Sequence, residues 1–409
     1  MAASNPTRPH SLLFLTIILG SVQAIMPMSI DLYLPALPTI ANELNVAAGS
    51  VQFTVAIFMI GVAIGQVIYG PITDKFGRKT PLLFGFGLYV IGAVICASAP
   101  TITWLIIGRF VQALGASAGA VISSAIARDL WSGNMLADRL SLLVLVLGVA
   151  PILAPSLGGV ILGQWDWHGL FWFLVLYGVA VASAVTLLPE TSSATERSNV
   201  RLADAGHTYL AIMRNRPFML YVLTGACTIG MLLTYITSSS FIYIEILGTS
   251  PSTFGLIFGL NAIGFVGAAQ LNRLLLRRFH LAQMAHIALA AAMLIGLILA
   301  ALGQSGQATI ISVTILFSML GMCVGFSMPN IAALAFAHIK ERMGSASALQ
   351  GTTQSVVGGI AGTLVGLLSN GSMIPTALII GAFATIASVL LVIAQRMTAP
   401  AQPATPHSR

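Results

Sequence analysis

The chain has 409 residues, of which 57% are hydrophobic and only 7% are charged. About a quarter of the residues of a soluble globular protein are charged, so this composition excludes that class and indicates membrane helices. The net charge of +7 does not indicate nucleic-acid binding, because the basic residues stand singly or in short clusters between apolar runs. The three cysteines lie within apolar runs without metal-ligand spacing, so we expect no metal site.

Twelve apolar runs are long enough to cross a bilayer, which predicts an all-α polytopic membrane protein. The first run is about twice as long as the apolar core of a signal peptide, so we interpret it as a retained span. Twelve transmembrane helices in two six-helix bundles are therefore expected. The predicted spans cover residues 12–38, 50–72, 80–99, 102–126, 137–163, 167–188, 217–246, 253–275, 281–303, 308–334, 345–368 and 373–395.

The distribution of lysine and arginine predicts the orientation of these spans. Every Lys and Arg except Arg109 falls on the side of the membrane that holds both ends of the chain. Basic residues concentrate in cytoplasmic segments, so both termini are predicted to be cytoplasmic. We expect a multi-pass protein of the bacterial cytoplasmic (inner) membrane.

The longest polar interval, residues 189–216, separates six predicted spans from six. We interpret it as a cytoplasmic linker, with a short surface helix over residues 200–213. The predicted domains are an N-terminal six-helix bundle over residues 1–188 and a C-terminal six-helix bundle over residues 217–396. The proline-containing tail, residues 397–409, is predicted to be disordered and cytoplasmic.

The first predicted span contains one carboxylate, Asp31. A charge inside the bilayer costs about 2.5–3.5 kcal/mol on insertion scales, so it needs a partner or a function. Arg109 in the fourth span is expected at the same depth, about 10 Å below the outer boundary. The two side chains would form an ion pair if spans 1 and 4 face each other. A protonatable or cation-sensing site, a static salt bridge and a helix cap near the headgroups all remain open.

The first cytoplasmic loop combines glycines with charges of both signs: Gly70, Asp74, Gly77, Arg78 and Lys79. Glycines permit a tight turn, and the charges can attach to neighbouring helix ends. Any short cytoplasmic loop is expected to be basic, but this order of glycine, acid and base is more specific than that.

Span 4 contains Gly115, Ser117 and Gly119, which match the G-x-S-x-G pattern of serine hydrolases. That pattern requires a strand, a turn and a helix, whereas here it lies within a long apolar helix. We therefore predict that the two glycines form a helix-packing face.

Span 5 contains two prolines and two glycines, which weaken the backbone hydrogen bonding of a helix. A simple kink, a hinge and a tight packing seam between helices are the alternatives. The residues concerned are Pro151, Pro155, Gly158 and Gly159.

Polar and aromatic side chains within the spans are candidates to line a substrate cavity. Each of them could equally form a hydrogen bond between helices. The candidates are Gln23, Tyr33, Gln52, Gln112, Tyr235, Asn261, Asn330 and Gln354.

With these motifs the chain resembles major facilitator superfamily transporters of the twelve-span drug:proton antiporter type, and most of all the Bcr/CflA (bicyclomycin-resistance-like) subfamily. Residues 29–38 resemble the first-span signature of that subfamily. Residues 70–79 are similar to the superfamily loop motif, and residues 109–119 to the fourth-span motif. Residues 150–159 resemble the antiporter motif, although alanine replaces glycine at two positions.

The resemblance implies the major facilitator fold and proton-driven export by alternating access. Asp31 would be the protonation site and Arg109 its conformation-dependent partner. The loop around Asp74 and Arg78 would latch the cytoplasmic side together with Asp129.

We therefore expect a multidrug or metabolite exporter that acts as a monomer in the lipid bilayer. Protons would be the coupling ion, with no cofactor and no nucleic-acid partner. Because Asp31 is the only acid deep in the first half, neutral or zwitterionic substrates are favoured over dications. The alternatives are an uncoupled facilitator or importer, a membrane enzyme based on Ser117, and a sensor that transports nothing.

Overall fold

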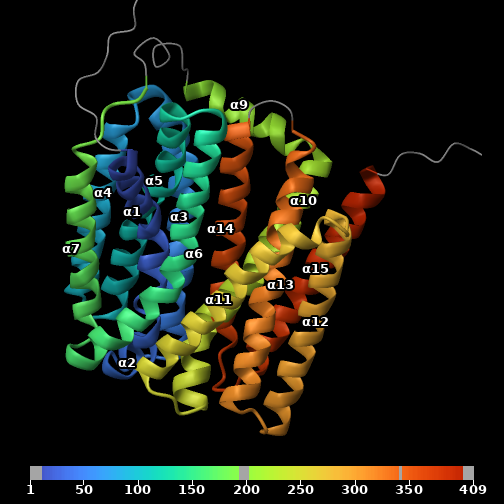
Figure 1. Ribbon diagram of the computed structural model, residues 1–409. Coiled ribbons are helices and arrows are strands. Elements are labelled where there is room, and N and C mark those ends of the chain that lie inside the picture. Colours follow the sequence, from blue (N-terminus) through green and yellow to red (C-terminus); the bar gives the residue numbers. More distant parts are fainter. Residues whose placement is uncertain (1–11, 193–201, 340–342, 399–409) are drawn as a thin grey trace, which may run out of the picture.

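The computed structural model describes residues 12–192, 202–339 and 343–398, and it is helical throughout these ranges (Figure 1). Twelve of its helices are long and apolar enough to cross a membrane, which confirms the predicted fold class and number of spans. Many large apolar side chains point outward, among them Leu176, Leu297 and Leu378. Such exposure is expected where lipid tails rather than water surround the helices.

The helices of the first half are long and joined by short connections. They are α1 (Leu12–Asp31), the 3₁₀ turn η1 (Leu34–Ala36), α2 (Leu37–Glu43), α3 (Ala48–Phe76), α4 (Lys79–Ala97), α5 (Ile102–Leu130), α6 (Gly133–Gln164) and α7 (His168–Val185).

The second half begins with a short helix that lies across the end of the molecule (Figure 1). Its elements are α9 (Leu202–Met213), α10 (Arg216–Ser240), the π-helix η2 (Phe241–Ile246), α11 (Pro251–Leu275), α12 (Leu281–Ser305), α13 (Ile310–Phe336), α14 (Met343–Leu368) and α15 (Ile374–Thr398).

Local sequence signals explain where several of these helices begin. The side chain of Asn215 accepts a hydrogen bond from the amide of Phe218 (3.1 Å) at the start of α10, and Ser250 does the same at α11. Each of these caps is followed by a proline in the first turn, where its missing N–H costs nothing.

Contacts between helices divide the molecule into two groups. In the first half α1 packs on α5, α6 and α7, and in the second half α10 packs on α13, α14 and α15. The two groups meet where α3 packs on α14 and where α6 packs on α11. In Figure 1, α11 crosses diagonally from the base of α6 towards α12 and α13.

The two ends of the molecule are named here after the helices that lie there. The α2 face, at the bottom of Figure 1, holds α2 and the connection between η2 and α11. The α9 face, at the top, holds α9, the beginning of α1 and the end of α15. The beginning of α1 and the end of α15 lie at the same face, as expected for an even number of membrane crossings.

The structure differs from the sequence prediction at the first and seventh spans. The first predicted span is not one helix to residue 38: α1 ends at Asp31, and η1 and α2 follow. The two prolines after the break, Pro35 and Pro38, lack the N–H groups that would continue the helix. The seventh span ends in the π-helix η2.

Between the halves, α9 confirms the predicted surface helix over its described residues, Leu202–Met213. The beginning of the predicted N-terminal bundle, part of the predicted linker (193–201) and most of the tail (399–409) lie outside the described residues. The domain boundaries and the disordered tail therefore stay predictions.

Candidate functional site

Asp31 is the last residue of α1 and is only 3% exposed. Among the described residues it has no hydrogen-bond or ion-pair partner. The turn after it leads into η1, which contacts α10 and α11 of the second helical group. The carboxyl group therefore lies where the two halves of the molecule meet.

Arg109 of α5 is completely buried, with 0% exposure. Its Nη1 donates hydrogen bonds to the carbonyl of Ser29 (2.9 Å) and to Oε1 of Gln112 (2.7 Å). The guanidinium carbon lies 4.2 Å from the ring centre of Phe58 and 4.4 Å from that of Tyr33. Aromatic faces attract cations, so these rings stabilise the charge without a carboxylate.

The predicted ion pair between Asp31 and Arg109 is not formed in this structure. The salt bridges among the described residues involve Asp74, Asp129 and Asp166, and none involves Arg109. The guanidinium instead binds the backbone two residues before Asp31, and its Nε and Nη2 atoms have no hydrogen-bond partner. Asp31 and Arg109 were predicted to lie at the same depth, but in the structure the two side chains have different neighbours.

Two other predicted residues belong to the surroundings of Arg109. The Tyr33 hydroxyl donates a hydrogen bond to the Thr54 hydroxyl (3.0 Å). The Thr54 hydroxyl in turn donates a hydrogen bond to the carbonyl of Val51. Gln112 accepts from Arg109 on the same helix. Gln23 lies elsewhere, where it accepts a hydrogen bond from Ser123 of α5.

In the second half, Tyr235 and Asn261 form one polar cluster. The amide of Asn261 donates to the Tyr235 hydroxyl (3.0 Å), and its oxygen accepts from Ser318 (2.5 Å). The Tyr235 ring packs on Phe317 with ring centres 4.8 Å apart. This cluster joins α10, α11 and α13.

The other predicted cavity residues have different surroundings. Asn330 exchanges two amide hydrogen bonds with Asn272 (2.9 and 3.0 Å), which ties α13 to α11 inside the second group. The Nε2 atom of Gln354 is buried without a hydrogen-bond partner. Gln52 lines a cavity at the α2 face.

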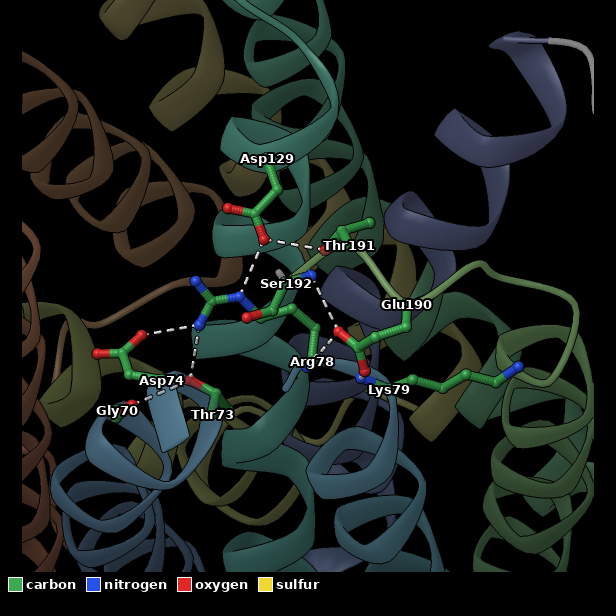
Figure 2. A network of polar contacts seen from close by, with 9 residues as sticks. All are labelled: Gly70, Thr73, Asp74, Arg78, Lys79, Asp129, Glu190, Thr191 and Ser192. Atoms are coloured by element: carbon green, nitrogen blue, oxygen red, sulfur yellow. Dashed lines mark hydrogen bonds and ion pairs between the residues drawn. The ribbon is translucent and has the colours of Figure 1, made fainter. Parts of the chain in front are cut away.

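The predicted latch residues form a network at the α9 face, shown in Figure 2. Arg78 forms ion pairs with Asp74 of α3 (2.8 Å) and with Asp129 of α5 (2.9 Å). Partial burial alone would lower the pKa of the Arg78 guanidinium, but the hydrogen bonds and charges of Asp129 and Asp74 outweigh that effect and raise it. These contacts join three helices of the first group.

Gly77 and Lys79 shape this loop in different ways. Gly77 has φ = +89°, a conformation that side chains disfavour, so glycine is needed there. Lys79 donates to the carbonyl of Thr186 (2.6 Å) after α7. Gly70 accepts a hydrogen bond from Thr73 (2.9 Å) and lies beside Tyr209 of α9.

Glu190 belongs to the same network, although the sequence analysis did not identify its role. Its two carboxylate oxygens accept from the backbone amides of Arg78 (2.9 Å) and Lys79 (3.1 Å) at the start of α4. A carboxylate at a helix N-terminus satisfies unpaired N–H groups and complements the helix dipole. Next to it, Thr191 donates to Asp129 (2.9 Å). The sequence did contain a signal for this role. Glu190 is an acidic residue directly after the sixth span, on the side of the membrane where basic residues are expected.

The residues of the predicted hinge lie on a continuous helix, since α6 runs unbroken through Pro151 and Pro155. A Cβ atom on Gly158 would overlap the carbonyl of Leu32, and one on Gly159 would come within 2.9 Å of the Cα atom of Ser252 in α11. The glycines therefore permit the tight packing that was one of the alternatives. Whether α6 bends during function stays a prediction.

The G-x-S-x-G residues also pack against neighbouring helices. A Cβ atom on Gly115 would overlap the backbone of α4, and one on Gly119 would come within 2.8 Å of the Val22 carbonyl of α1. The Ser117 hydroxyl donates to the carbonyl of Leu114 (2.7 Å) on its own helix. The serine thus has a structural hydrogen bond and no catalytic geometry.

The described residues contain no group of three or more His, Cys, Asp or Glu side chains that could hold a metal ion. They do contain two aromatic residues near Arg109 that the sequence analysis missed, Phe58 and Phe171. Phenylalanine is common in apolar spans, so no sequence signal set these two apart.

The chain is similar to known proteins over most of its length. Residues 19–363 match the family model described as Major Facilitator Superfamily. The chain is 33% identical over 371 residues to the uncharacterised MFS-type transporter YdgK of Bacillus subtilis strain 168, covering 89% of this chain and 90% of the relative.

Two further comparisons agree with this similarity. The bicyclomycin resistance protein homolog of Haemophilus influenzae is 31% identical over 374 residues, with 89% of this chain and 92% of the relative covered. The crystal structure of a D-xylose–proton symporter superposes with a TM-score of 0.71 at 15% identity, covering 93% of this chain and 97% of the symporter. The last comparison concerns the fold alone.

Proposed function

We propose that this chain, which belongs to the Major Facilitator Superfamily, is a proton-coupled antiporter. It would export small, mostly apolar drugs or metabolites. The protein is a multi-pass membrane transporter and not an enzyme. The similarity to a bicyclomycin resistance protein homolog supports drug export. An uncoupled facilitator or importer is the alternative.

One observation carries the proposal of proton coupling: Asp31 is buried without a described partner at the junction of the two helical groups. An unpaired buried carboxylate is costly, and binding a proton removes its charge. The break in α1 lies where η1 contacts α10 and α11, so the charge state of Asp31 would affect how the two groups pack. Proton binding can in this way be coupled to a change in access.

Arg109 would supply a fixed positive charge beside the end of α1, where it binds the Ser29 carbonyl. Its guanidinium is held by the Ser29 carbonyl, by Gln112 and by the rings of Tyr33 and Phe58. None of these four contacts involves the Asp31 carboxyl group. The two unpartnered nitrogens could accept a new contact in another conformation.

In the proposed cycle, a proton from the outer side binds Asp31 and neutralises it. The neutral state opens to the cytoplasm, where cargo binds and the proton leaves. The ionised, loaded protein then opens outward and releases the cargo. The proton and the cargo move in opposite directions, so the proton gradient drives export.

We propose that the α9 face is cytoplasmic and that the protein works as a monomer in a bacterial inner membrane, with protons as its only coupling ion. Basic side chains in the last turns of α3, α5, α11 and α15 support this orientation; they are Lys75, Arg128, Arg273 and Arg396. Cytoplasmic loops carry an excess of such residues.

The test uses purified protein in proteoliposomes with an imposed proton gradient and bicyclomycin as the cargo. The unchanged protein should accumulate bicyclomycin against its concentration gradient and release protons in return. Asp31→Asn should lose both proton movement and uphill transport but keep exchange of labelled for unlabelled cargo.

Glu43→Gln is the matched control, because Glu43 is an exposed carboxylate at the end of α2. It should transport as the unchanged protein does. Gradient-driven transport that survives Asp31→Asn would overturn the coupling role of Asp31. Transport that ignores the proton gradient altogether would favour a facilitator.

A further inference from the structure

A cavity of about 370 Å³ lies at the α2 face, between the two helical groups. It is bounded by α2 and α3 of the first group and by α10, η2, α14 and α15 of the second. Cavities that bind small molecules have volumes of roughly 300–1,000 Å³. The space is therefore large enough for a small organic ligand.

Glu245 gives this cavity a negative charge. It stands on the π-helix η2, and within the described part of the chain it has no hydrogen bond or ion pair. Ser238, Phe241 and Ile242 line the same cavity. Glu245 is exposed and lines the cavity beside them.

Gln52 of α3 adds a buried acceptor to the lining of the cavity. It is 2% exposed, it lines the cavity from α3, and its Oε1 atom has no hydrogen-bond partner. A buried acceptor without a partner is costly, and buried polar groups are rarely left so. A ligand that donates a hydrogen bond would satisfy it.

Ser238 offers only lone pairs to the cavity. Its hydroxyl proton is donated to the Thr234 carbonyl (2.7 Å) one turn earlier. The carboxylate of Glu245 and the amide oxygen of Gln52 are likewise acceptors. The polar groups with these defined roles therefore favour a ligand that is rich in donors.

The surrounding charges also favour a cation. No lysine or arginine lines the cavity. The sequence places none in the connections of the α2 face either. An anionic ligand would find no partner here.

We propose that this cavity binds a small organic ammonium ion. The ammonium group pairs with Glu245 and donates to Gln52 and Ser238, while Phe241 and Val365 contact its carbon skeleton. Three donors of a primary ammonium match three acceptors. A single carboxylate is too few anionic ligands for a calcium or magnesium site.

The role of this site in export rests on the proposed function: it is where an amine-bearing cargo is held as it leaves at the outer face. Both helical groups contribute walls, so the site changes when the groups separate. Binding itself needs no proton gradient and can be measured separately.

The first experiment measures binding to the purified full-length protein in lipid nanodiscs by isothermal titration calorimetry. The probes are benzylammonium, its neutral counterpart benzyl alcohol and the anion benzoate. Benzylammonium should bind, and Glu245→Gln should weaken it about tenfold, as expected for the loss of a charge-assisted hydrogen bond. Gln52→Leu should weaken it less, and Glu43→Gln should leave it unchanged.

The second experiment locates the binding with a cysteine at Ser369, an exposed residue that lines the cavity. The native cysteines are buried and provide a low background. A cationic methanethiosulfonate reagent should react with Ser369→Cys about fivefold faster than an anionic one, because of the nearby carboxylate. Glu245→Gln should abolish the difference, and benzylammonium should protect the cysteine.

Equal reaction rates for the two reagents, or equal binding of benzylammonium and benzyl alcohol, would overturn the site. Equal protection by sodium or magnesium ions would show a non-selective cation site and would also overturn it. These readouts do not depend on transport. Failure of Asp31→Asn to uncouple the transporter would leave them unaffected, so the two proposals can fail separately.

Discussion

Two arginines of the first helical group, Arg78 and Arg109, are stabilised in opposite ways. Arg78 lies at the α9 face and pairs with the carboxylates of Asp74 and Asp129. Arg109 is buried among the spans and contacts aromatic rings, a backbone carbonyl and an amide. Asp31, a buried carboxylate at the end of α1, has no hydrogen-bond or ion-pair partner among the described residues.

The difference shows two uses of a charged side chain. One charge stabilises a loop through an ion pair, whereas another stays unpaired and is available for a function. Where water reaches the molecule, a carboxylate pair holds a loop at modest cost. Inside the spans, a carboxylate locked to Arg109 could not easily bind and release protons. Aromatic and backbone partners stabilise the arginine, which keeps Asp31 available for the proton coupling proposed above.

Arg109→Lys should have the largest effect on transport, because it removes the contacts that distinguish Arg109 from Arg78. A lysine ammonium keeps the charge but lacks the planar group that contacts the two rings and the Ser29 carbonyl together. Transport in proteoliposomes should fall to the level of empty vesicles. Arg396→Lys, at an exposed position on α15, should transport normally. Full activity of Arg109→Lys would show that charge alone matters.

Phe58→Leu should weaken the ring contact with Arg109 while keeping much of the apolar volume. A desolvated cation–π contact contributes about 2 kcal/mol, so thermal unfolding should occur at lower temperature than in a matched variant. The match is Phe86→Leu, since Phe86 is equally buried on α4. Similar unfolding temperatures for both would mean that the ring stabilises by packing alone.

Asp129→Asn and Asp74→Asn sharpen the other side of the comparison. The Asp129 side chain is 23% exposed and that of Asp74 is 55% exposed, so solvent screens the Asp74 pair more strongly. Asp129 also accepts from Thr191. We expect a loss of about 1 kcal/mol for Asp129→Asn and less for Asp74→Asn. High salt should reduce both losses, as measured by unfolding in detergent.

Gly77→Ala tests the loop that positions Arg78. Alanine at φ = +89° is strained, which costs about 1 kcal/mol or slightly more. Gly87→Ala on α4 is the control, because nothing lies within 4 Å of its added Cβ atom and alanine favours a helix. The two variants should shift the unfolding temperature in opposite directions. A shift in the same direction would contradict the strain argument.

The number of spans was predictable from the sequence because each span is an apolar run of sufficient length. The break of α1 at Asp31 was not, since Leu32–Leu37 is as apolar as the helix before it. Hydropathy measures transfer into lipid and carries little information on where a helix ends. The prolines that follow were the only local signal.

The glycines, acid and bases of the loop were predictable because they stand within ten residues of one another, whereas Glu190 of the same network follows α7 and its role was not identified. The surroundings of Arg109 were not, because Phe58 and Phe171 come from α3 and α7, far away in the chain. The sequence identified Asp31 and Arg109 as unusual charges. It could not show their orientation, which depends on how the helices rotate against each other.

At two positions near the α2 face the halves meet through main-chain atoms. A Cβ atom on Gly49 would overlap the carbonyl of Gly366, and one on Gly255 would come within 2.6 Å of the Pro155 carbonyl. Peptide groups do not titrate and carry no net charge. Such a seal should therefore hold equally well in acidic or saline surroundings, so the medium that supplies the driving protons cannot jam it. Any side chain larger than hydrogen at these positions would act as a permanent wedge.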